Sequence, residues 1–174
     1  MAISKRVFLG IRLSQEAKKQ IKDFQEKYQD LPVKWTSLDD LHITLVPPFC
    51  SIELDKLIAV LGDYNFPKPF QIKTKTVSYG PDKDNPRLIW LQVEESEELY
   101  NLKKEIYKSL SLKLPEQKFL PHITLARFKY LDKKDLEINF ENIEIEEKVE
   151  RFDLIQTIEI IGGSKYISKG SFYL

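Results

Sequence analysis

The chain has 174 residues, 42% of them apolar and 31% charged, a balance typical of a globular protein that buries its own core. Its 27 basic and 27 acidic residues cancel, which argues against binding along a nucleic acid by bulk positive charge. Cys50 is the only cysteine, so no disulfide forms within the chain. With no signal-peptide core and no apolar run of about 18 residues, the expectation is a cytoplasmic monomer without membrane contact.

The first half of the chain alternates between strand and helix patterns. Strict alternation of apolar residues indicates a strand, and recurrence every three or four residues indicates a helix. These patterns predict, in order, a strand at 6–13, a helix over 17–28 with Ser14 as N-cap, an extended piece at 33–36, a strand at 41–46, a short helix over 54–61 capped by Ser51, and a strand at 70–79. The strand at 41–46 should stop at Pro47 and Pro48, because proline cannot donate to a strand ladder.

The second half follows a turn-rich segment at 80–86. Its pattern predicts a strand at 88–93, a helix over 99–110 opened by Ser96, and a strand within 118–128. The charged stretch at 131–149 is ambiguous and is interpreted as a short helix and an irregular connection, and 152–161 and 165–174 form a closing hairpin around Gly162-Gly163-Ser164. Both halves run strand, helix, extended linker, strand, connection, strand. This order predicts one domain over 1–174, an α+β fold with a pseudo-twofold relation between halves that meet near 80–86.

The tetrapeptide His-Ile-Thr-Leu occurs twice, at 42–45 and 122–125, and the two copies contain both histidines of the chain. Side chains alternate along a strand, so in each copy His and Thr share one face and Ile and Leu share the other. The Ile/Leu face should pack against the helices. If the pseudo-twofold relates the two strands, His42 and Thr44 face His122 and Thr124 across one groove.

Paired histidines and threonines suit phosphodiester hydrolysis. One imidazole can take a proton from an attacking water while the other, protonated, gives one to the leaving oxygen, since the unperturbed pKa of histidine is about 6.5. The hydroxyls of Thr44 and Thr124 can donate to non-bridging phosphate oxygens. The alternatives are a chance occurrence on two alternating strands and a metal site. Two histidines without clustered cysteines or carboxylates are too few metal ligands, so we expect neither a metal nor a cofactor.

The two tetrapeptides resemble the paired His-x-Thr-x signature of the 2H phosphoesterase superfamily, and the chain resembles its RNA 2′,3′-cyclic phosphodiesterase branch, also called 2′-5′ RNA ligase. The similar stretches are 33–42, 121–127 and 163–166, whereas 46–50 depart from the branch. The resemblance implies antiparallel sheets in two lobes with outer helices and a central cleft, no metal, and hydrolysis of 2′,3′-cyclic phosphates on RNA 3′ ends or nucleotides to 2′-phosphomonoesters. It also implies His42 as the proton donor to the 3′-oxygen and His122 as the base, roles that the symmetric motifs alone do not assign.

Two further residues are candidates for substrate binding. Arg127 lies three residues after Thr124, so on a regular strand its side chain would point away from the His/Thr face. A bulge would bring the guanidinium back to that face, where it can bind a phosphate. Otherwise it is a surface arginine. Tyr166 lies just after a glycine turn and can stack on a base. Phe8 and Trp35 can stack too, but we expect them in the core.

Other functions remain open at this point. The same chemistry can act on a cyclic phosphate of ADP-ribose or on a 2′-5′-linked oligonucleotide, and in reverse it can ligate RNA ends. A module that binds RNA ends without catalysis belongs to a different class. Both intact His/Thr pairs favour an enzyme, because binding alone does not require two titratable imidazoles.

Overall fold

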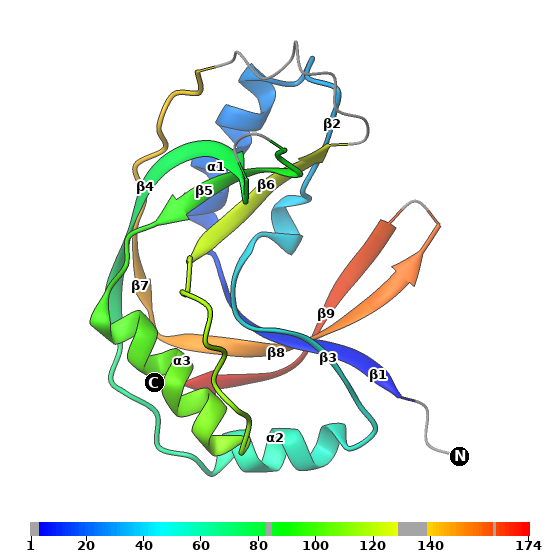
Figure 1. The fold of residues 1–174 in the computed structure, drawn as a ribbon, viewed down its shortest axis with the longest axis vertical. Helices are drawn as coiled ribbons and strands as arrows, with labels where there is room; N and C mark the ends of the chain where they lie inside the picture. Colours follow the sequence, from blue (N-terminus) through cyan, green and yellow to red (C-terminus); the bar gives the residue numbers. More distant parts are fainter. Residues whose placement is uncertain (1–3, 83–84, 129–138, 162) are drawn as a thin grey trace.

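The computed structural model describes residues 4–82, 85–128, 139–161 and 163–174 (Figure 1). These residues form nine strands, three α-helices and one 3₁₀ turn. In chain order they are β1 (Lys5–Arg12), α1 (Gln15–Lys27), β2 (Val33–Trp35), η1 (Leu38–Asp40), β3 (His42–Ser51), α2 (Leu54–Gly62), β4 (Phe70–Gly80), β5 (Leu88–Val93), α3 (Glu97–Ser109), β6 (His122–Phe128), β7 (Glu146–Val149), β8 (Arg151–Ile160) and β9 (Gly163–Tyr173).

The strands form one curled antiparallel sheet in the order β7-β4-β5-β6-β3-β1-β8-β9, with β2 paired to β6 off this path. The predicted α+β class with antiparallel pairing is therefore confirmed. The strands β3 and β6 meet in the middle of the sheet. One arm holds β3, β1, β8 and β9 and the other holds β6, β5, β4 and β7, so each arm takes strands from both halves of the chain.

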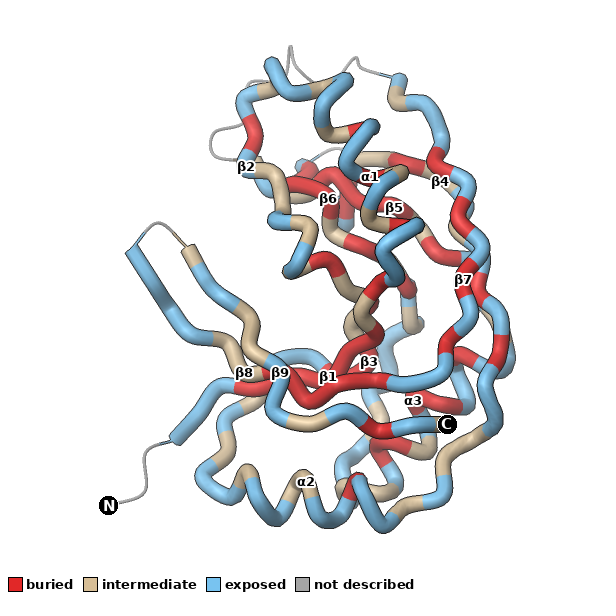
Figure 2. Tube along the Cα trace, turned by 180° about the vertical axis from the view of Figure 1, so that it is seen from behind, coloured by how far each residue is buried: buried red, intermediate tan, exposed pale blue. Residues whose placement is uncertain are grey.

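The helices cover the outside of the curl. Figures 1 and 2 both place α1 beside β4, β5 and β6, although α1 follows β1, and both place α2 and α3 at the opposite end. Buried residues come from strands of both arms in Figure 2, whereas the projecting end of the β8–β9 hairpin is exposed or half-buried. The helix-covered face of the sheet is therefore one continuous core, which holds the two motif strands in place.

Two of the predicted helix caps are confirmed. Ser14 Oγ accepts the N–H of Ala17 at 3.2 Å, and Ser96 Oγ accepts the N–H of Leu99 at 3.1 Å. The predicted cap at Ser51 is wrong. Ser51 is the last residue of β3, and its Oγ accepts the N–H of Glu53, one residue before α2 begins.

The expected end of the first motif strand at its two prolines is also wrong, because β3 continues to Ser51. Val46 pairs with Leu9, and the next pair is Phe49 with Val7, so Pro47 and Pro48 together face a single residue of β1. This is a β-bulge, where an unpaired residue does not need to donate to the ladder. Both prolines are exposed, so neither buries an unpaired backbone group.

The ambiguous stretch at 131–149 contains a strand that the pattern did not reveal. β7 pairs with β4 along four residues, from Phe70 opposite Val149 to Lys73 opposite Glu146. Glu147 occupies an inward position that is normally apolar, which hides the alternation. Its Oε1 accepts the N–H of Ser14 at 2.6 Å at the start of α1. Residues 129–138 lie outside the described part of the chain.

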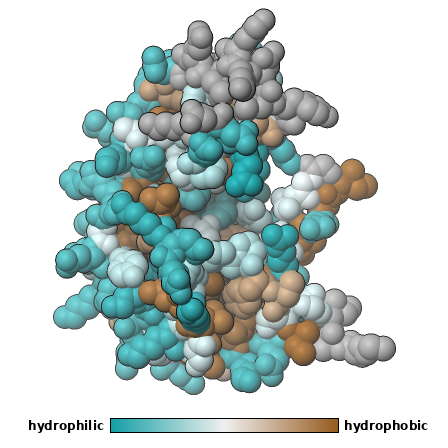
Figure 3. Space-filling view, in the orientation of Figure 1, coloured by the Kyte–Doolittle hydropathy of each residue, from teal (hydrophilic) through white to brown (hydrophobic). Residues whose placement is uncertain are grey.

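The closing hairpin is confirmed, with β8 and β9 paired from Arg151–Tyr173 to Ile160–Gly163. It projects from the body in Figure 1, and apolar residues gather at its tip in Figure 3. Gly162 of the turn lies outside the described residues. Among the helices that the structure describes, none is long and apolar enough to cross a membrane.

Candidate active site

The two motif strands meet at equivalent positions of their tetrapeptides. Ile43 of β3 pairs with Ile123 of β6 in antiparallel register. This register sets His42 opposite Thr124 and His122 opposite Thr44, and it makes the two histidines diagonal neighbours across the strand pair. Diagonal Cα atoms lie about 7–8 Å apart in such a pair.

Each motif strand also contains a bulge directly after its threonine. Pairing jumps from Thr44 to Val46 on β3 and from Thr124 to Ala126 on β6, so each copy has an extra leucine at the same place. A bulge of one residue reverses the alternation beyond it. On β6 this reversal brings Arg127 to the face of His122 and Thr124.

A central cavity of about 310 Å³ lies against this face. Four of the predicted site residues line it: His42, Thr124, Arg127 and Tyr166. The remaining wall comes from β2, η1 and the start of β9, through Lys34, Trp35, Thr36, Ser37, Asp40, Gly163 and Ser164. Thr44 is half-buried and lines neither this cavity nor the one at His122.

His122 lines a different, smaller cavity of about 90 Å³, together with Lys75, Trp90, Gln92 and Glu95. The two predicted histidines therefore line two different cavities, which share no lining residue, and not the single groove that was expected. Trp35 was expected in the core, but it is half-buried and forms part of the central cavity wall. Phe8 is fully buried, as expected.

Both imidazoles are held in the same way by the backbone. His42 Nδ1 lies 2.6 Å from the carbonyl oxygen of Asp40, and His122 Nδ1 lies 2.8 Å from that of Leu120. A carbonyl oxygen only accepts, so Nδ1 carries the hydrogen in each neutral ring. Nε2 is then the nitrogen that can exchange a proton with a substrate, and this is what acid–base catalysis requires.

The surroundings disfavour a charged imidazole at both positions. Burial, assisted by the positive charges of Arg12 and Arg127, lowers the pKa of His42 from 6.5 to about 4, against the opposing effect of the Asp40 carbonyl. Burial also lowers the pKa of His122 below 6.5, against the effect of the Leu120 carbonyl. An anionic phosphate between the rings would favour their protonated forms, because opposite charges attract.

Aromatic rings hold both imidazoles from the side. The His42 ring lies 4.7 Å from Phe8 and 5.3 Å from Tyr166, the latter edge-on. The His122 ring lies 4.6 Å from Trp90. Tyr166 therefore packs against a candidate catalytic ring as well as lining the cavity.

The position of the Trp90 ring depends on the absence of a side chain at Gly80. Its indole lies against Gly80, where an added Cβ would overlap the ring, and its Nε1 donates to Ser78 Oγ at 2.8 Å. Gly80→Ala should therefore displace Trp90 from His122 and lower the free energy of unfolding by about 1–3 kcal/mol, the usual cost of overpacking.

Urea unfolding measures this cost. The matched control is Gly62→Ala, because a Cβ at Gly62, the last residue of α2, meets nothing within 4 Å. It should leave stability unchanged or raise it by up to about 1 kcal/mol. Equal unfolding midpoints for the two variants would show that Trp90 does not need the space at Gly80.

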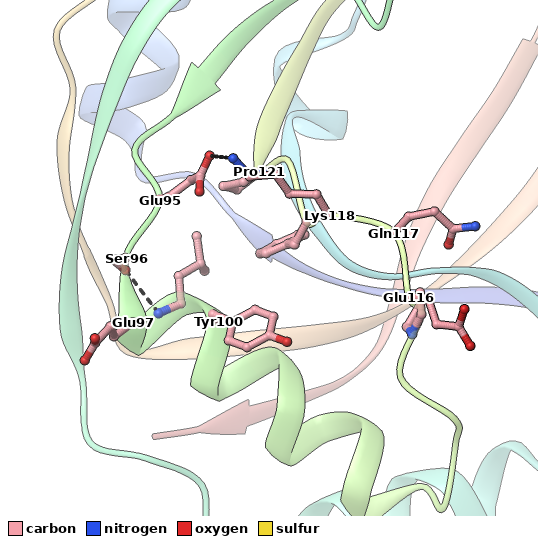
Figure 4. Close-up of a pocket in the computed structure, with 11 residues that line it drawn as sticks. Glu95, Ser96, Glu97, Tyr100, Glu116, Gln117, Lys118 and Pro121 are labelled. Carbon is pink, nitrogen blue, oxygen red and sulfur yellow. Dashed lines mark hydrogen bonds and ion pairs between the residues drawn. The ribbon is translucent and has the colours of Figure 1, made fainter.

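A larger cavity of about 460 Å³ lies at the start of α3 (Figure 4), and it shares Glu95 and Pro121 with the cavity of His122. Glu95, Glu97 and Glu116 line it, and Lys118 Nζ lies 2.8 Å from Glu95 Oε1. This acidic lining disfavours a phosphate, so the chemistry is better placed in the central cavity. Within the described residues, no group of three or more His, Cys, Asp or Glu side chains is arranged to hold a metal ion.

Comparisons with known proteins agree on one family. A family model described as the 2′-5′ RNA ligase superfamily matches residues 13–159. The chain is 32% identical over 164 residues to an RNA 2′,3′-cyclic phosphodiesterase of Thermotoga maritima, and the match covers 86% of this chain and 84% of that protein. It is 29% identical over 185 residues to a protein of the same name from Aquifex aeolicus, with 97% of both covered.

Two solved structures share the fold. The protein TT0787 of Thermus thermophilus superposes with a TM-score of 0.78 at 22% identity, covering 97% of both chains. E. coli LigT complexed with 3′-AMP superposes with a TM-score of 0.76 at 20% identity, covering 99% of both chains. The similarity therefore extends over nearly the whole folded chain.

Proposed function

The chain belongs to the 2′-5′ RNA ligase superfamily, and from this premise we propose that it hydrolyses RNA 2′,3′-cyclic phosphate ends to 2′-phosphomonoesters without a metal. The relatives from Thermotoga and Aquifex that are named RNA 2′,3′-cyclic phosphodiesterase support the chemistry. The complex of E. coli LigT with 3′-AMP supports a nucleotide ligand. The balanced charge of the chain fits a monomer that contacts an RNA end instead of a long duplex.

The proposed reaction uses the two Nε2 atoms on opposite sides of the phosphorus. One neutral imidazole takes a proton from water as the water oxygen bonds to phosphorus. The bond from phosphorus to the 3′-oxygen breaks, and the other imidazole, protonated, gives its proton to that oxygen. The products are a 2′-phosphomonoester and a free 3′-hydroxyl, with the proton exchanged between the two rings.

Two other polar residues of the cavity are suited to stabilise the negative charge on the non-bridging phosphate oxygens. Thr124 lies directly across from His42, where its hydroxyl can donate to a non-bridging oxygen. Arg127 presents a guanidinium, whose fork of donors matches a phosphate. The single observation that carries the proposal is the matched pair of imidazoles, each fixed at Nδ1 and each free to use Nε2.

A substrate panel in EDTA tests the proposal. We expect the highest kcat/KM for an RNA oligonucleotide that ends in a 2′,3′-cyclic phosphate, since Arg127 lines the same cavity as Tyr166 and Trp35, whose rings can stack on a base. Higher kcat/KM for a cyclic phosphate of ADP-ribose or for a 2′-5′-linked oligonucleotide would reassign the substrate. Tight binding of the RNA without turnover from about pH 5 to 9, on either side of the ordinary histidine pKa, would indicate a binding module.

The pH dependence follows from the lowered pKa values. In the free protein both histidines titrate below 6.5, so the singly protonated pair is most populated on the acid side of that value and is lost as pH rises. We expect kcat/KM to peak below about pH 6.5. The kcat profile should peak at higher pH, because the bound anionic phosphate favours the protonated rings. A kcat/KM that still increases above about pH 8 would contradict this account.

A further inference from the structure

Two cationic side chains lie next to each other on the wall of the central cavity. Lys34 of β2 pairs with Arg127 of β6 in the antiparallel register, and both residues line the cavity. Residues paired in this way project from the same face of the sheet, with their Cα atoms about 5 Å apart. Like charges directly opposite each other destabilise a strand pair, so an anion bound in front of Lys34 and Arg127 would stabilise it.

The two cations reach different parts of the cavity. Arg127 lies close enough to both motif histidines for its positive charge to lower the pKa of His42 and of His122. The amine of Lys34 instead reaches the β8–β9 hairpin, where its Nζ occupies the space that a Cβ at Gly163 would fill. Arg127 is therefore placed to contact a phosphate beside the histidines, whereas Lys34 contacts the far wall of the cavity.

The hairpin shows how far apart these two places are. Tyr166 packs edge-on against His42, with the ring centroids 5.3 Å apart, and Gly163 lies three residues before Tyr166 on β9. A strand rises about 3.3 Å per residue, so the two hairpin positions are separated by about 10 Å along β9. This span exceeds the size of one phosphate group, so the amine of Lys34 is placed to bind a second one.

The cavity wall near these positions is suited to a nucleoside. Trp35 follows Lys34 on β2, and both Trp35 and Tyr166 line the cavity with rings that can stack on a base. The hydroxyls of Ser37 and Ser164 belong to the same wall and can hydrogen-bond to a sugar or to a base edge. The cavity volume of about 310 Å³ is at the lower end of the range for small-ligand sites, which fits one nucleoside.

One carboxyl group also lines this cavity, that of Asp40. It accepts the backbone N–H of Tyr166, and the positive charges of Arg12 and Lys165 act on it. Burial has the largest effect and raises the pKa of Asp40, which means that its surroundings disfavour the charged form. Asp40 is therefore engaged with the hairpin backbone, and the cations of the wall remain able to bind an anion.

We propose that Lys34 binds a second phosphate, the one on the 5′ side of the nucleoside whose cyclic phosphate lies beside the histidines. The preferred ligand is then an RNA end, in which the preceding phosphodiester supplies this phosphate, and not a nucleoside cyclic phosphate that lacks it. The proposal deepens the proposed function and rests on it for the identity of the reacting group. The second phosphate site itself can be measured by binding alone.

Calorimetry with two nucleotides tests the site without any turnover. The ligands are adenosine 2′-phosphate and adenosine 2′,5′-bisphosphate, in about 0.15 M salt, where exposed charges more than about 8 Å apart are largely screened. The wild-type protein should bind the bisphosphate more tightly, on the order of tenfold, as expected for one added hydrogen bond between charged groups. Lys34→Gln should bind the two ligands with equal dissociation constants.

Two further variants separate this contact from general electrostatics. Lys169→Gln is the matched control, because Lys169 is an exposed lysine of β9 outside the cavity lining and its replacement removes the same charge. It should keep the wild-type preference for the bisphosphate. Lys34→Arg should keep most of that preference, since a guanidinium also binds phosphate. A preference that falls as far in Lys169→Gln or Lys34→Arg as in Lys34→Gln would overturn the proposal.

Steady-state kinetics identifies the source of the second phosphate. The value of kcat/KM should increase from adenosine 2′,3′-cyclic phosphate to the dinucleotide ApA that ends in the same cyclic phosphate, on the order of tenfold and mainly through KM. A gain from a 5′-monophosphate on adenosine 2′,3′-cyclic phosphate, with none for the dinucleotide, would overturn the assignment to an RNA end.

The two ideas fail in different ways. Equal dissociation constants of the wild-type protein for adenosine 2′-phosphate and adenosine 2′,5′-bisphosphate would overturn the second phosphate site. Failure of the proposed function would show as no turnover of any cyclic phosphate, while the wild-type protein still prefers the bisphosphate and Lys34→Gln does not.

Discussion

Replacing His42 or His122 by Ala should lower kcat for a nucleoside 2′,3′-cyclic phosphate by about 10²–10⁴-fold, the contribution of one positioned acid or base. In the proposed mechanism the two rings act in the same step, so the double variant should lose little more than the worse single variant. KM should change much less than kcat, because Arg127 and Thr124, which line the central cavity, are unchanged in these variants and are the proposed phosphate ligands. Steady-state kinetics in EDTA measures each of these effects.

The control for this prediction must separate catalysis from packing, because the His42 ring contacts Phe8 and Tyr166. His42→Asn and His122→Asn retain an amide N–H that can replace the Nδ1 donor to the backbone carbonyl. These variants should unfold within about 1 kcal/mol of wild type and still be inactive. Near wild-type turnover by either asparagine variant would remove that histidine from the mechanism.

Removing the hydroxyl of Thr124 should lower kcat by about 10²-fold, the typical loss of one donor to developing charge. Thr124→Val keeps the shape and β-branching of the side chain on β6, so the change is confined to the hydroxyl. Thr124 lies opposite His42 and lines the central cavity, which places its hydroxyl beside any phosphate held there. Single-turnover kinetics would report the chemical step directly.

Thr124→Ser is the matched control, since it retains the hydroxyl and loses only a methyl group. We expect it to keep activity within a few-fold of wild type. If Thr124→Val were as active as Thr124→Ser, the hydroxyl would have no part in stabilising the phosphate, and the role assigned to the motif threonine would be wrong.

Local sequence signals predicted the features that depend on neighbours in the chain. Ser14 and Ser96 cap their helices through bonds to residues three positions later, and such caps are readable from sequence. The family was predicted from the repeated tetrapeptide, and the family model and the relatives confirm it. The roles assigned to the site residues remain predictions.

Features set by strand pairing were harder to predict. The bulge at Pro47 and Pro48 exists only because β1 supplies one residue opposite two, and the bulge at Leu125 decides the face of Arg127. β7 was missed because Glu147 is buried at an inward position, where its Oε1 accepts the Ser14 N–H. None of these facts appears in the periodicity of a single segment.

Arg12 illustrates the same limit within the site. Its position next to His42 depends on the register of β1 with β3, and its partners lie on η1, β8 and β9. The two motifs are identical in sequence, so they do not reveal that Arg12 lies opposite His42 whereas Gln92 lies opposite His122.

The two-histidine mechanism is tested most directly by the product formed from adenosine 2′,3′-cyclic phosphate in EDTA, followed by ³¹P NMR. We expect adenosine 2′-phosphate as the single product, made by wild type and not by the His42→Asn/His122→Asn double variant. Formation of the 3′-phosphate, or equal turnover by the double variant, would contradict the two-histidine mechanism.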